Sequence, residues 1–225
     1  MKNLAIIPAR GGSKRIPKKN IRDFLGKPII AYSIETALKS NMFSEVIVTT
    51  DSEEIAKVAT SFGATVPFLR SKKSSNDYAP LADVIDEVLA YYKHKKEFDF
   101  ICCLLPTVPL INKKNLKKGL EILTTDNSID SVKPVVPFSY PIQRALKMKN
   151  GVLEWTNPEF VTTRTQDLEP LFHDAGQFWW MKFENGFRGK KKVGFEITSL
   201  EVQDIDNYDD WEIAEIKYKL LHKIE

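Results

Sequence analysis

Short apolar runs alternate with amphipathic segments over the first 136 residues of the chain. The run at 4–7 has no polar interruption, which is typical of a strand buried on both faces, and Pro8 ends it because proline cannot donate to a sheet ladder. Further strands are predicted at 45–50, 64–69, 99–105 and 131–136, helices at 28–39, 52–62, 81–92 and 115–123, and a loop at 70–78. This order predicts an α/β fold, a mostly parallel sheet with helices on both faces.

The alternation of predicted strands and helices ends after residue 137. A strong turn signal, Asn-Gly at 150–151, predicts a hairpin over 143–155 within an arm at 138–170 that projects from the body. Trp155 and Phe160 give this arm more apolar surface than a free loop needs, so we expect it either to form a dimer interface or to pack on its own domain. Two late strands at 176–182 and 192–197 and a final helix at 209–222 complete the chain.

The composition predicts one globular domain over 1–225, with 43% hydrophobic residues and a net charge of +3. No apolar stretch approaches the ~20 residues of a membrane span, and the N-terminus lacks a signal-peptide pattern, so we expect a cytoplasmic protein with no membrane partner. The small charge excess argues against a nucleic-acid partner. Cys102 and Cys103 are adjacent in an apolar run, which predicts buried reduced thiols rather than zinc ligands or a disulfide.

A basic loop directly follows the first strand. Gly11 and Gly12 are expected to adopt positive φ, so that consecutive amides can approach an anion. The spacing satisfies neither G-x-G-x-x-G nor G-x-x-x-x-G-K-[ST], which weakens the dehydrogenase, kinase and P-loop ATPase hypotheses. Turn chemistry alone also explains the glycines, but this loop lies at the sheet edge where open α/β folds bind ligands, so a polyanion site is favoured. Its positive charge comes from Arg10, Lys14, Arg15, Lys18 and Lys19.

Two carboxylates alternate near the end of the chain, in Q-D-I-D-N. Asp204 and Asp206 can therefore face the same side of an extended segment. Hard oxygen ligands of this kind suit Mg²⁺, which usually binds through one or two carboxylates together with substrate phosphates and water. The alternative is that Asp206, Asn207 or Asp209 merely caps the last helix. The basic loop at the other end of the chain favours the magnesium site.

Four segments carry a resemblance to a known family: I-I-P-A-R-G-G-S-K-R-I-P-K-K-N, L-G-K-P-I-I-A-Y-S-I, V-I-V-T-T-D and the late D-I-D. Together they resemble the CMP-sialic acid synthetase family over nearly the whole chain. The resemblance implies a Rossmann-like nucleotidyltransferase that joins CTP to a nine-carbon 2-keto acid sugar, with Mg²⁺ as cofactor and generally as a homodimer. It also implies a role in cell-surface or flagellar glycosylation.

The resemblance also implies roles for individual residues. Arg70, in F-L-R-S-K-K-S-S-N-D-Y-A, resembles the arginine that reads the cytosine edge, and the backbone near Ala79 helps to exclude other bases. The implied nucleotide-binding residues are Ala9, Arg10, Gly11, Gly12, Ser13, Lys14, Lys19, Asn20, Arg70 and Ala79. The implied catalytic residues are Arg10, Lys14, Lys19 and Asp206, and the implied metal ligands are Asp204 and Asp206.

The choice of sugar depends on a departure from the family pattern. The usual L-L-Q-P-T-S-P is C-L-L-P-T-V-P here, so Leu105 replaces a glutamine that resembles a sugar contact, and a missing polar contact discriminates strongly between sugars. P-F-S-Y-P-I-Q-R-A and R-T-Q-D-L-E-P-L-F-H-D-A-G-Q-F-W-W resemble the pseudaminic acid cytidylyltransferase branch, whose acceptor is a di-N-acylated, deoxygenated sugar. The candidate sugar-binding residues are Leu105, Arg144, Arg164, Gln166, His173, Asp174, Gln177 and Phe178.

The chemistry of these side chains leaves alternatives open. The planar guanidinium of Arg164 suits the sugar carboxylate, with Arg144 as a second cation. At least one residue of the aromatic run at 178–180 is expected to belong to the core, and a structural role for His173 is as well supported as a substrate contact. The alternative acceptors are N-acetylneuraminic, legionaminic and 3-deoxy-manno-octulosonic acid, and the alternative from another class is a non-catalytic nucleotide- or sugar-sensing module.

Overall fold

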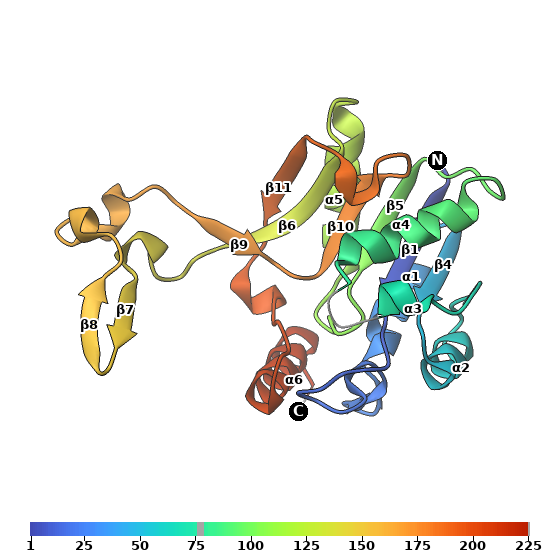
Figure 1. Cartoon of the computed structure of the whole chain (residues 1–225), viewed down its shortest axis with the longest axis horizontal. Helices are drawn as coiled ribbons and strands as arrows, with labels where there is room; N and C mark the ends of the chain where they lie inside the picture. The colour runs from blue at the N-terminus through green and yellow to red at the C-terminus, as the bar shows by residue number, and fades with distance from the viewer. Residues whose placement is uncertain (76–78, 225) are drawn as a thin grey trace.

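The computed structural model describes residues 1–75 and 79–224 and contains a seven-stranded sheet. Its strands are β1 (Asn3–Pro8), β4 (Glu45–Thr49), β5 (Phe100–Leu104), β6 (Ser131–Pro137), β9 (Phe172–Asp174), β10 (Phe178–Lys182) and β11 (Lys192–Glu196). They lie in the order β11, β6, β10, β5, β1, β4, with β9 beside β6 (Figure 1). Two separate hairpins pair β2 (Asp23–Phe24) with β3 (Lys27–Pro28) and β7 (Leu146–Lys149) with β8 (Val152–Trp155).

The strand directions confirm the predicted, mostly parallel sheet. β1 is parallel to β4 and β5, and β6 is parallel to β11. β10 runs antiparallel to both of its neighbours, β5 and β6, which makes those two strands parallel to each other. β9 is also antiparallel to β6. Five strands therefore share one direction, and their carboxyl ends meet at one edge.

Helices cover both faces of this sheet. They are α1 (Ile30–Ser40), α2 (Glu53–Ser61), α3 (Lys72–Ser75), α4 (Leu81–Tyr92), α5 (Lys113–Thr125) and α6 (Tyr208–His222). The side chains of β1 alternate between the faces: Ala5 and Ile7 join the core that includes α1, α2 and α5, whereas Leu4 and Ile6 pack with α4. The side chains of these four residues are inaccessible to solvent, as the uninterrupted apolar run predicted. No helix within residues 1–75 and 79–224 has the length and apolar character needed to cross a membrane.

Three predicted elements differ in the structure. Pro28 belongs to β3 rather than to the first turn of a helix, and α1 begins at Ile30. The segment 64–69 is not a regular strand. Isolated bridges join Thr65 to Ile47 of β4 and Leu69 to Thr50 just after it, and Pro67 between them lacks the ladder donor. Part of the loop predicted at 70–78 forms α3, and its last three residues, 76–78, lie outside the described residues.

The last helix packs beside the β2–β3 hairpin. Phe24, Tyr32 and Trp211 form a small aromatic core there with Ile205. The Asn207 side chain accepts from the Asp210 N–H at 2.9 Å, and the Asp210 carboxylate accepts from the Asn207 N–H at 3.1 Å, which is a capping box. Asn207 is thus the N-cap among the candidates considered, so the cap does not need the Asp206 side chain.

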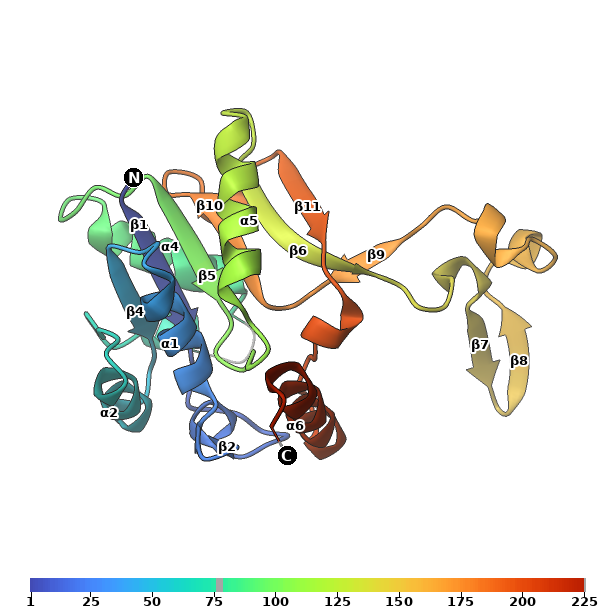
Figure 2. The ribbon, with the colours of Figure 1, turned by 180° about the vertical axis from the view of Figure 1, so that it is seen from behind.

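The β7–β8 hairpin lies well away from the sheet in both opposite views (Figures 1 and 2). Asn150 and Gly151 at its turn have φ of 50° and 80°, the left-handed conformation that a two-residue hairpin turn requires. Leu146 stands opposite Trp155, and Met148 opposite Leu153, so these four side chains share one face of the hairpin. Their exposed fractions are 49%, 38%, 74% and 59%. The hairpin therefore presents an apolar face to solvent.

Candidate active site

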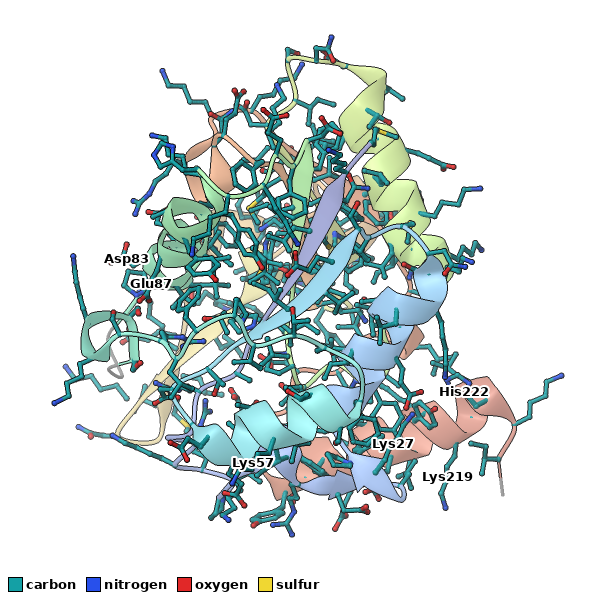
Figure 3. All side chains as sticks on the ribbon, turned by 90° about the vertical axis from the view of Figure 1, so that its right-hand side faces the viewer. Lys27, Lys57, Asp83, Glu87, Lys219 and His222 are labelled. Carbon is teal, nitrogen blue, oxygen red and sulfur yellow. The ribbon has the colours of Figure 1, made fainter. Side chains whose placement is uncertain are left out.

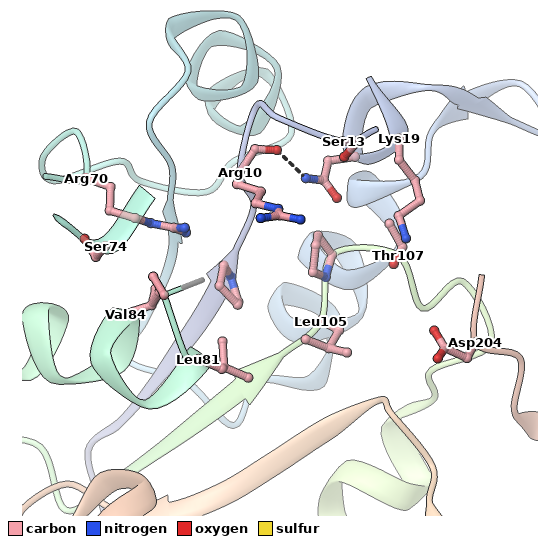
Figure 4. A pocket seen from close by; sticks show the side chains of 14 residues that line it. Arg10, Ser13, Lys19, Arg70, Ser74, Leu81, Val84, Leu105, Thr107 and Asp204 are labelled. Carbon is pink, nitrogen blue, oxygen red and sulfur yellow. Dashed lines mark hydrogen bonds between the residues drawn. The ribbon is translucent and has the colours of Figure 1, made fainter. Parts of the chain in front are cut away.

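A cavity of about 400 Å³ opens at the carboxyl edge of the sheet (Figure 4). β1 ends there at Pro8, and Leu105 follows the end of β5. The cavity is lined by Pro8, Arg10, Ser13, Lys19, Asn20, Arg70, Ser74, Ala79, Leu81, Val84, Leu105, Pro106, Thr107 and Asp204. Residues from both ends of the chain thus form one site, where open α/β folds bind ligands.

The basic loop is held against the end of β4. The Ala9 N–H donates to the Thr49 carbonyl at 3.0 Å, and the Gly11 N–H donates to Asp51 Oδ1 at 2.8 Å. The prediction of positive φ at Gly11 and Gly12 is wrong, since neither residue has it. Gly11 instead approaches the start of α2 closely: a Cβ there would lie 3.3 Å from Ser52 Cβ, a tight contact. Its amide already has an acceptor in Asp51, so it is not free to bind an anion in this conformation.

Arg10 and Ser13 line the cavity from this loop, whereas Ala9, Gly11, Gly12 and Lys14 lie outside its lining. Asn20 also lines the cavity and is buried, and its Nδ2 donates to the Arg10 carbonyl at 2.8 Å, the bond drawn as a dashed line in Figure 4. This bond ties the start of the loop to its end. Because both ends of the loop are held by hydrogen bonds, the main chain at Arg10 has a fixed position.

Arg70 is a charged residue that is only 8% exposed. One terminal guanidinium nitrogen donates to the Thr49 carbonyl at 2.6 Å, and Nε lies 3.4 Å from Thr49 Oγ1. Burial lowers the pKa of Arg70, and the negative charges of Asp51 and Glu87 oppose that shift. β4 therefore fixes the orientation of the guanidinium in the cavity wall.

Lys19 connects the basic loop to the late aspartates. Its Nζ donates to the Ile205 carbonyl at 2.6 Å, between Asp204 and Asp206. Burial lowers the pKa of the Lys19 ammonium, and the carboxylates of Asp206 and Asp204 act in the opposite direction. The two halves of the site are thus joined by a direct hydrogen bond and by opposite charge.

The two aspartates flank a fully buried residue, Ile205. Asp204 lines the cavity, and Asp206 Oδ1 is 2.7 Å from the exposed guanidinium of Arg15. Within the part of the chain that the structure describes, no three His, Cys, Asp or Glu side chains form a metal cluster. The chemistry of two neighbouring carboxylates still fits Mg²⁺, which usually binds through one or two carboxylates together with phosphate oxygens and water.

A second cavity of about 310 Å³ shares Asp204 with the first. His173, Asp174 and Lys217 line it together with Asp204. Asp174 is held on both carboxylate oxygens, by Lys133 Nζ at 2.8 Å and by the Gly176 N–H at 2.8 Å. The structure thus places two of the candidate sugar residues beside the aspartate segment.

The three aromatic residues at 178–180 all have structural contacts. Phe178 and Trp180 are fully buried, and the Trp180 indole donates to the Leu116 carbonyl at 2.9 Å. Trp179 packs edge-on against Phe187, with ring centroids 5.6 Å apart. The assignment of Phe178 to the sugar pocket is therefore corrected: its side chain belongs to the core, because β10 turns it toward α5.

Gln177 lies next to Leu105, whose N–H donates to the Gln177 carbonyl at 2.9 Å. The Gln177 amide donates to the Glu201 carbonyl at 2.5 Å, and its Oε1 is buried without a hydrogen-bond partner among the described residues. Leu105 itself lines the first cavity. The apolar side chain of Leu105 therefore follows a strand next to Gln177, whose Oε1 could still accept a hydrogen bond.

The remaining candidate sugar residues lie on the arm and line neither cavity. Arg164 is exposed, and its Nε donates to Asp167 Oδ2 at 2.9 Å. Arg144 Nε is buried without a partner among the described residues, and Gln166 lines a small hollow within the arm itself. The structure does not bring these three residues to the cavity of the same chain.

Sequence reasoning missed two hydroxyl residues of the cavity, Ser74 and Thr107. Both lie inside motifs that were already recognised, the segment after Arg70 and the P-T-V-P turn after β5. Their place next to predicted site residues in the sequence could have indicated that they line the cavity.

A mostly parallel α/β sheet with a basic loop and an aspartate segment at its carboxyl edge is typical of ligand-binding α/β proteins. A cytidylyltransferase family model matches residues 4–178, so the chain belongs to the cytidylyltransferase family. This membership confirms the predicted resemblance.

Individual relatives are similar over part or nearly all of the chain. The chain is 42% identical over 231 residues to a pseudaminic acid cytidylyltransferase of Campylobacter jejuni subsp. jejuni, covering 99% of each chain. It is 42% identical over 137 residues to a CMP-N,N'-diacetyllegionaminic acid synthase of Legionella pneumophila, covering 60% of this chain and 59% of the other. A solved CMP:2-keto-3-deoxy-manno-octonic acid synthetase complexed with CTP has the same fold, with a TM-score of 0.72, 19% identity and full coverage of both chains.

Proposed function

We propose that this chain transfers the cytidylyl group of CTP to pseudaminic acid, giving CMP-pseudaminic acid and pyrophosphate. The observation that carries the proposal is the cavity that brings Arg10, Lys19, Arg70 and Asp204 together at the carboxyl edge of the sheet. The similarity over 99% of both chains to a pseudaminic acid cytidylyltransferase supports the choice of sugar. The buried thiols of Cys102 and Cys103 agree with a cytoplasmic location.

In the proposed reaction, the anomeric 2-hydroxyl oxygen of the sugar attacks the α-phosphorus of CTP in line with the leaving group. The new bond joins that oxygen to phosphorus, the bond from the α-phosphorus to the bridging oxygen breaks, and pyrophosphate departs. The hydroxyl proton is released to solvent. Arg10 and Lys19 offset negative charge on the phosphates, and Arg70 is placed to contact the base.

The metal belongs to this proposal as well. Asp204 and Asp206 would hold Mg²⁺, with phosphate oxygens completing the coordination. When bound, the ion would neutralise charge that develops on the phosphate oxygens. Lys19 Nζ donates to the Ile205 carbonyl, and this fixed main chain between the two aspartates supports the proposal.

We also propose that the arm at 138–170 forms a homodimer interface. Its apolar face, Leu146, Met148, Leu153 and Trp155, is exposed in the single chain, and an isolated two-stranded hairpin is at best marginally stable in water. A partner that covers this face would stabilise the hairpin and remove apolar surface from water.

The acceptor is tested by supplying CTP and Mg²⁺ with one sugar at a time and measuring both pyrophosphate release and the CMP-sugar product. Pseudaminic acid is expected to exceed N-acetylneuraminic and legionaminic acid in kcat/KM by at least about tenfold, because a mismatched polar group loses its partner at the site. A preference for either other sugar would contradict the assignment of the acceptor. CTP binding without turnover of any acidic sugar would instead support a sensing module.

A further inference from the structure

A carboxylate from α4 holds the turn that follows Arg70. Glu87 Oε1 accepts from the Ser71 N–H at 3.0 Å, and Oε2 accepts from the Ser74 hydroxyl. The turn is also closed on itself, since Ser75 Oγ donates to the Ser71 carbonyl at 2.7 Å. One carboxylate thus fixes the turn at two points, three residues apart.

This turn is part of the nucleotide cavity. Ser74 lines the cavity on one side and, on the other, a neighbouring cavity of about 460 Å³ that Glu87 also lines. Arg70 directly precedes Ser71 and shares the cavity wall with Ser74. Displacing the turn would therefore move the wall that faces the nucleotide.

Neighbouring acids on α4 have a different role. Asp83 and Asp86 accept from the Arg188 guanidinium at 2.9 and 2.7 Å, which ties α4 to the connection between β10 and β11. Asp83 and Glu87 lie on the same side of α4 (Figure 3). Two adjacent carboxylates of α4 therefore have different partners: Asp86 bonds to Arg188, and Glu87 bonds to the turn after Arg70.

The pKa of Glu87 agrees with its role in holding the turn. Burial raises the pKa of Glu87, but hydrogen bonds from Ser74 and Ser71 outweigh it, and the pKa stays below its usual value. The ionised carboxylate is also among the negative charges that favour the buried guanidinium of Arg70. Glu87 thus supports the cavity wall by contact and by charge.

We propose that Glu87 is a positioning residue for CTP, which keeps Ser74 and Arg70 in the geometry that binds the nucleotide. This inference rests on the assignment of the cavity to CTP. Glu87 lies behind the wall, so it acts through the turn and does not touch the substrate.

The experiment compares the wild-type protein with Glu87→Ala, Glu87→Gln and the control Asp86→Asn. CTP binding is measured by calorimetry without sugar, and KM is measured for each substrate. Glu87→Ala is expected to raise the Kd and KM for CTP about tenfold, because hydrogen bonds to a charged group are lost, while the KM for sugar changes less than twofold. Glu87→Gln keeps an oxygen acceptor and is expected to raise the Kd about threefold. Asp86→Asn is expected to bind CTP as the wild type does.

A CTP affinity within twofold of wild type in folded Glu87→Ala would overturn the inference. If Glu87→Ala does not fold, as judged by its thermal melt, an unchanged Kd in Glu87→Gln would overturn it. Equal rises in the KM values of both substrates, or the same loss in Asp86→Asn, would assign Glu87 a general structural role and also overturn it. A wild-type protein that binds no CTP would instead refute the proposed function.

Discussion

At the scale of single residues, the site depends on charged groups fixed by backbone atoms. The Arg70 guanidinium is oriented by the Thr49 carbonyl, and the Lys19 ammonium by the Ile205 carbonyl. These contacts fix the direction of each side chain before a ligand arrives, which reduces the ordering that binding requires. The preorganised charges are suited to a polyanion.

Arg70→Lys is expected to weaken CTP binding about tenfold and to reduce the preference for CTP over UTP, because a lysine cannot bond Thr49 and the base in the same planar geometry. Calorimetric titration with each nucleotide measures both effects. Arg188→Lys is the control, since Arg188 is exposed and bonds to Asp83 and Asp86 instead. A selectivity equal to that of the wild type in Arg70→Lys would remove Arg70 from base recognition.

Asp204→Asn and Asp206→Asn are each expected to lower kcat/KM by about 100-fold or more, as for the loss of a group that stabilises developing charge. Folding stability should change by less than about 1 kcal/mol, because the ion pair of Asp206 with Arg15 is exposed. Steady-state kinetics and urea unfolding separate the two effects. Asp209→Asn, an exposed residue of α6, is the control. Unchanged turnover in either test variant would exclude that residue from the metal site.

The sequence predicted many residues of the cavity but not their side-chain environments. Arg10, Lys19, Arg70 and Asp204 were found from motifs, because charge and spacing are visible in a sequence. Phe178 was assigned wrongly, since the choice between cavity and core depends on which way β10 faces. Gly11 was expected to have positive φ, whereas in the structure its distinguishing feature is its close approach to Ser52.

At the scale of elements, the pattern of apolar residues predicted β1, β4, β5 and β6 well, because strands buried on both faces are uninterrupted apolar runs. It did not predict that β10 runs antiparallel between β5 and β6, since strand direction follows from chain connection rather than from composition. Nor did it predict the short β2–β3 hairpin, in which two-residue strands leave no periodicity to detect.

A polar clamp joins β4 to the end of α4. Glu45 accepts from the Tyr92 hydroxyl at 2.7 Å and from Lys96 Nζ at 2.6 Å. Burial raises the pKa of Glu45, but these hydrogen bonds outweigh it and lower the pKa below 4.5. The folded state thus favours the ionised form, so the stabilisation is present above the unfolded pKa and is lost as the pH falls through the folded one.

Glu45→Gln is therefore expected to lower the free energy of unfolding by about 1–2 kcal/mol at pH 7, since bonds to a charged acceptor are weakened. The difference from wild type should shrink progressively as the pH falls below about 4.5. Denaturant unfolding at several pH values measures it. A difference that stays constant with pH would show that the charge of Glu45 does not stabilise this clamp.

The apolar face of the arm at 138–170 is proposed to hold the dimer together. Met148→Glu together with Leu153→Glu is expected to convert the proposed dimer to monomer, because two charges would enter the apolar face of the hairpin. Sedimentation velocity measures the change in mass. Exchanging Lys147 and Glu154, an opposed pair on the other face, is the control and should leave the dimer intact. A monomeric wild-type protein would contradict the proposed interface.

At the scale of the whole molecule, the site joins distant parts of the chain. Lys19 and Ile205 are 186 positions apart, yet their hydrogen bond links the loop after β1 to the segment before α6. The aromatic core of Phe24, Tyr32 and Trp211 holds the same two regions together. The basic loop and the aspartate segment are therefore joined through the fold rather than through one local motif.

The most direct test of this account uses CTP labelled at the α-phosphorus, with pseudaminic acid, Mg²⁺ and the purified protein. If the sugar hydroxyl attacks that phosphorus, the label must appear in CMP-pseudaminic acid, with one unlabelled pyrophosphate released for each product formed. Chromatography and scintillation counting measure both. Label recovered in pyrophosphate, or CTP left intact in the presence of the sugar, would contradict the central claim.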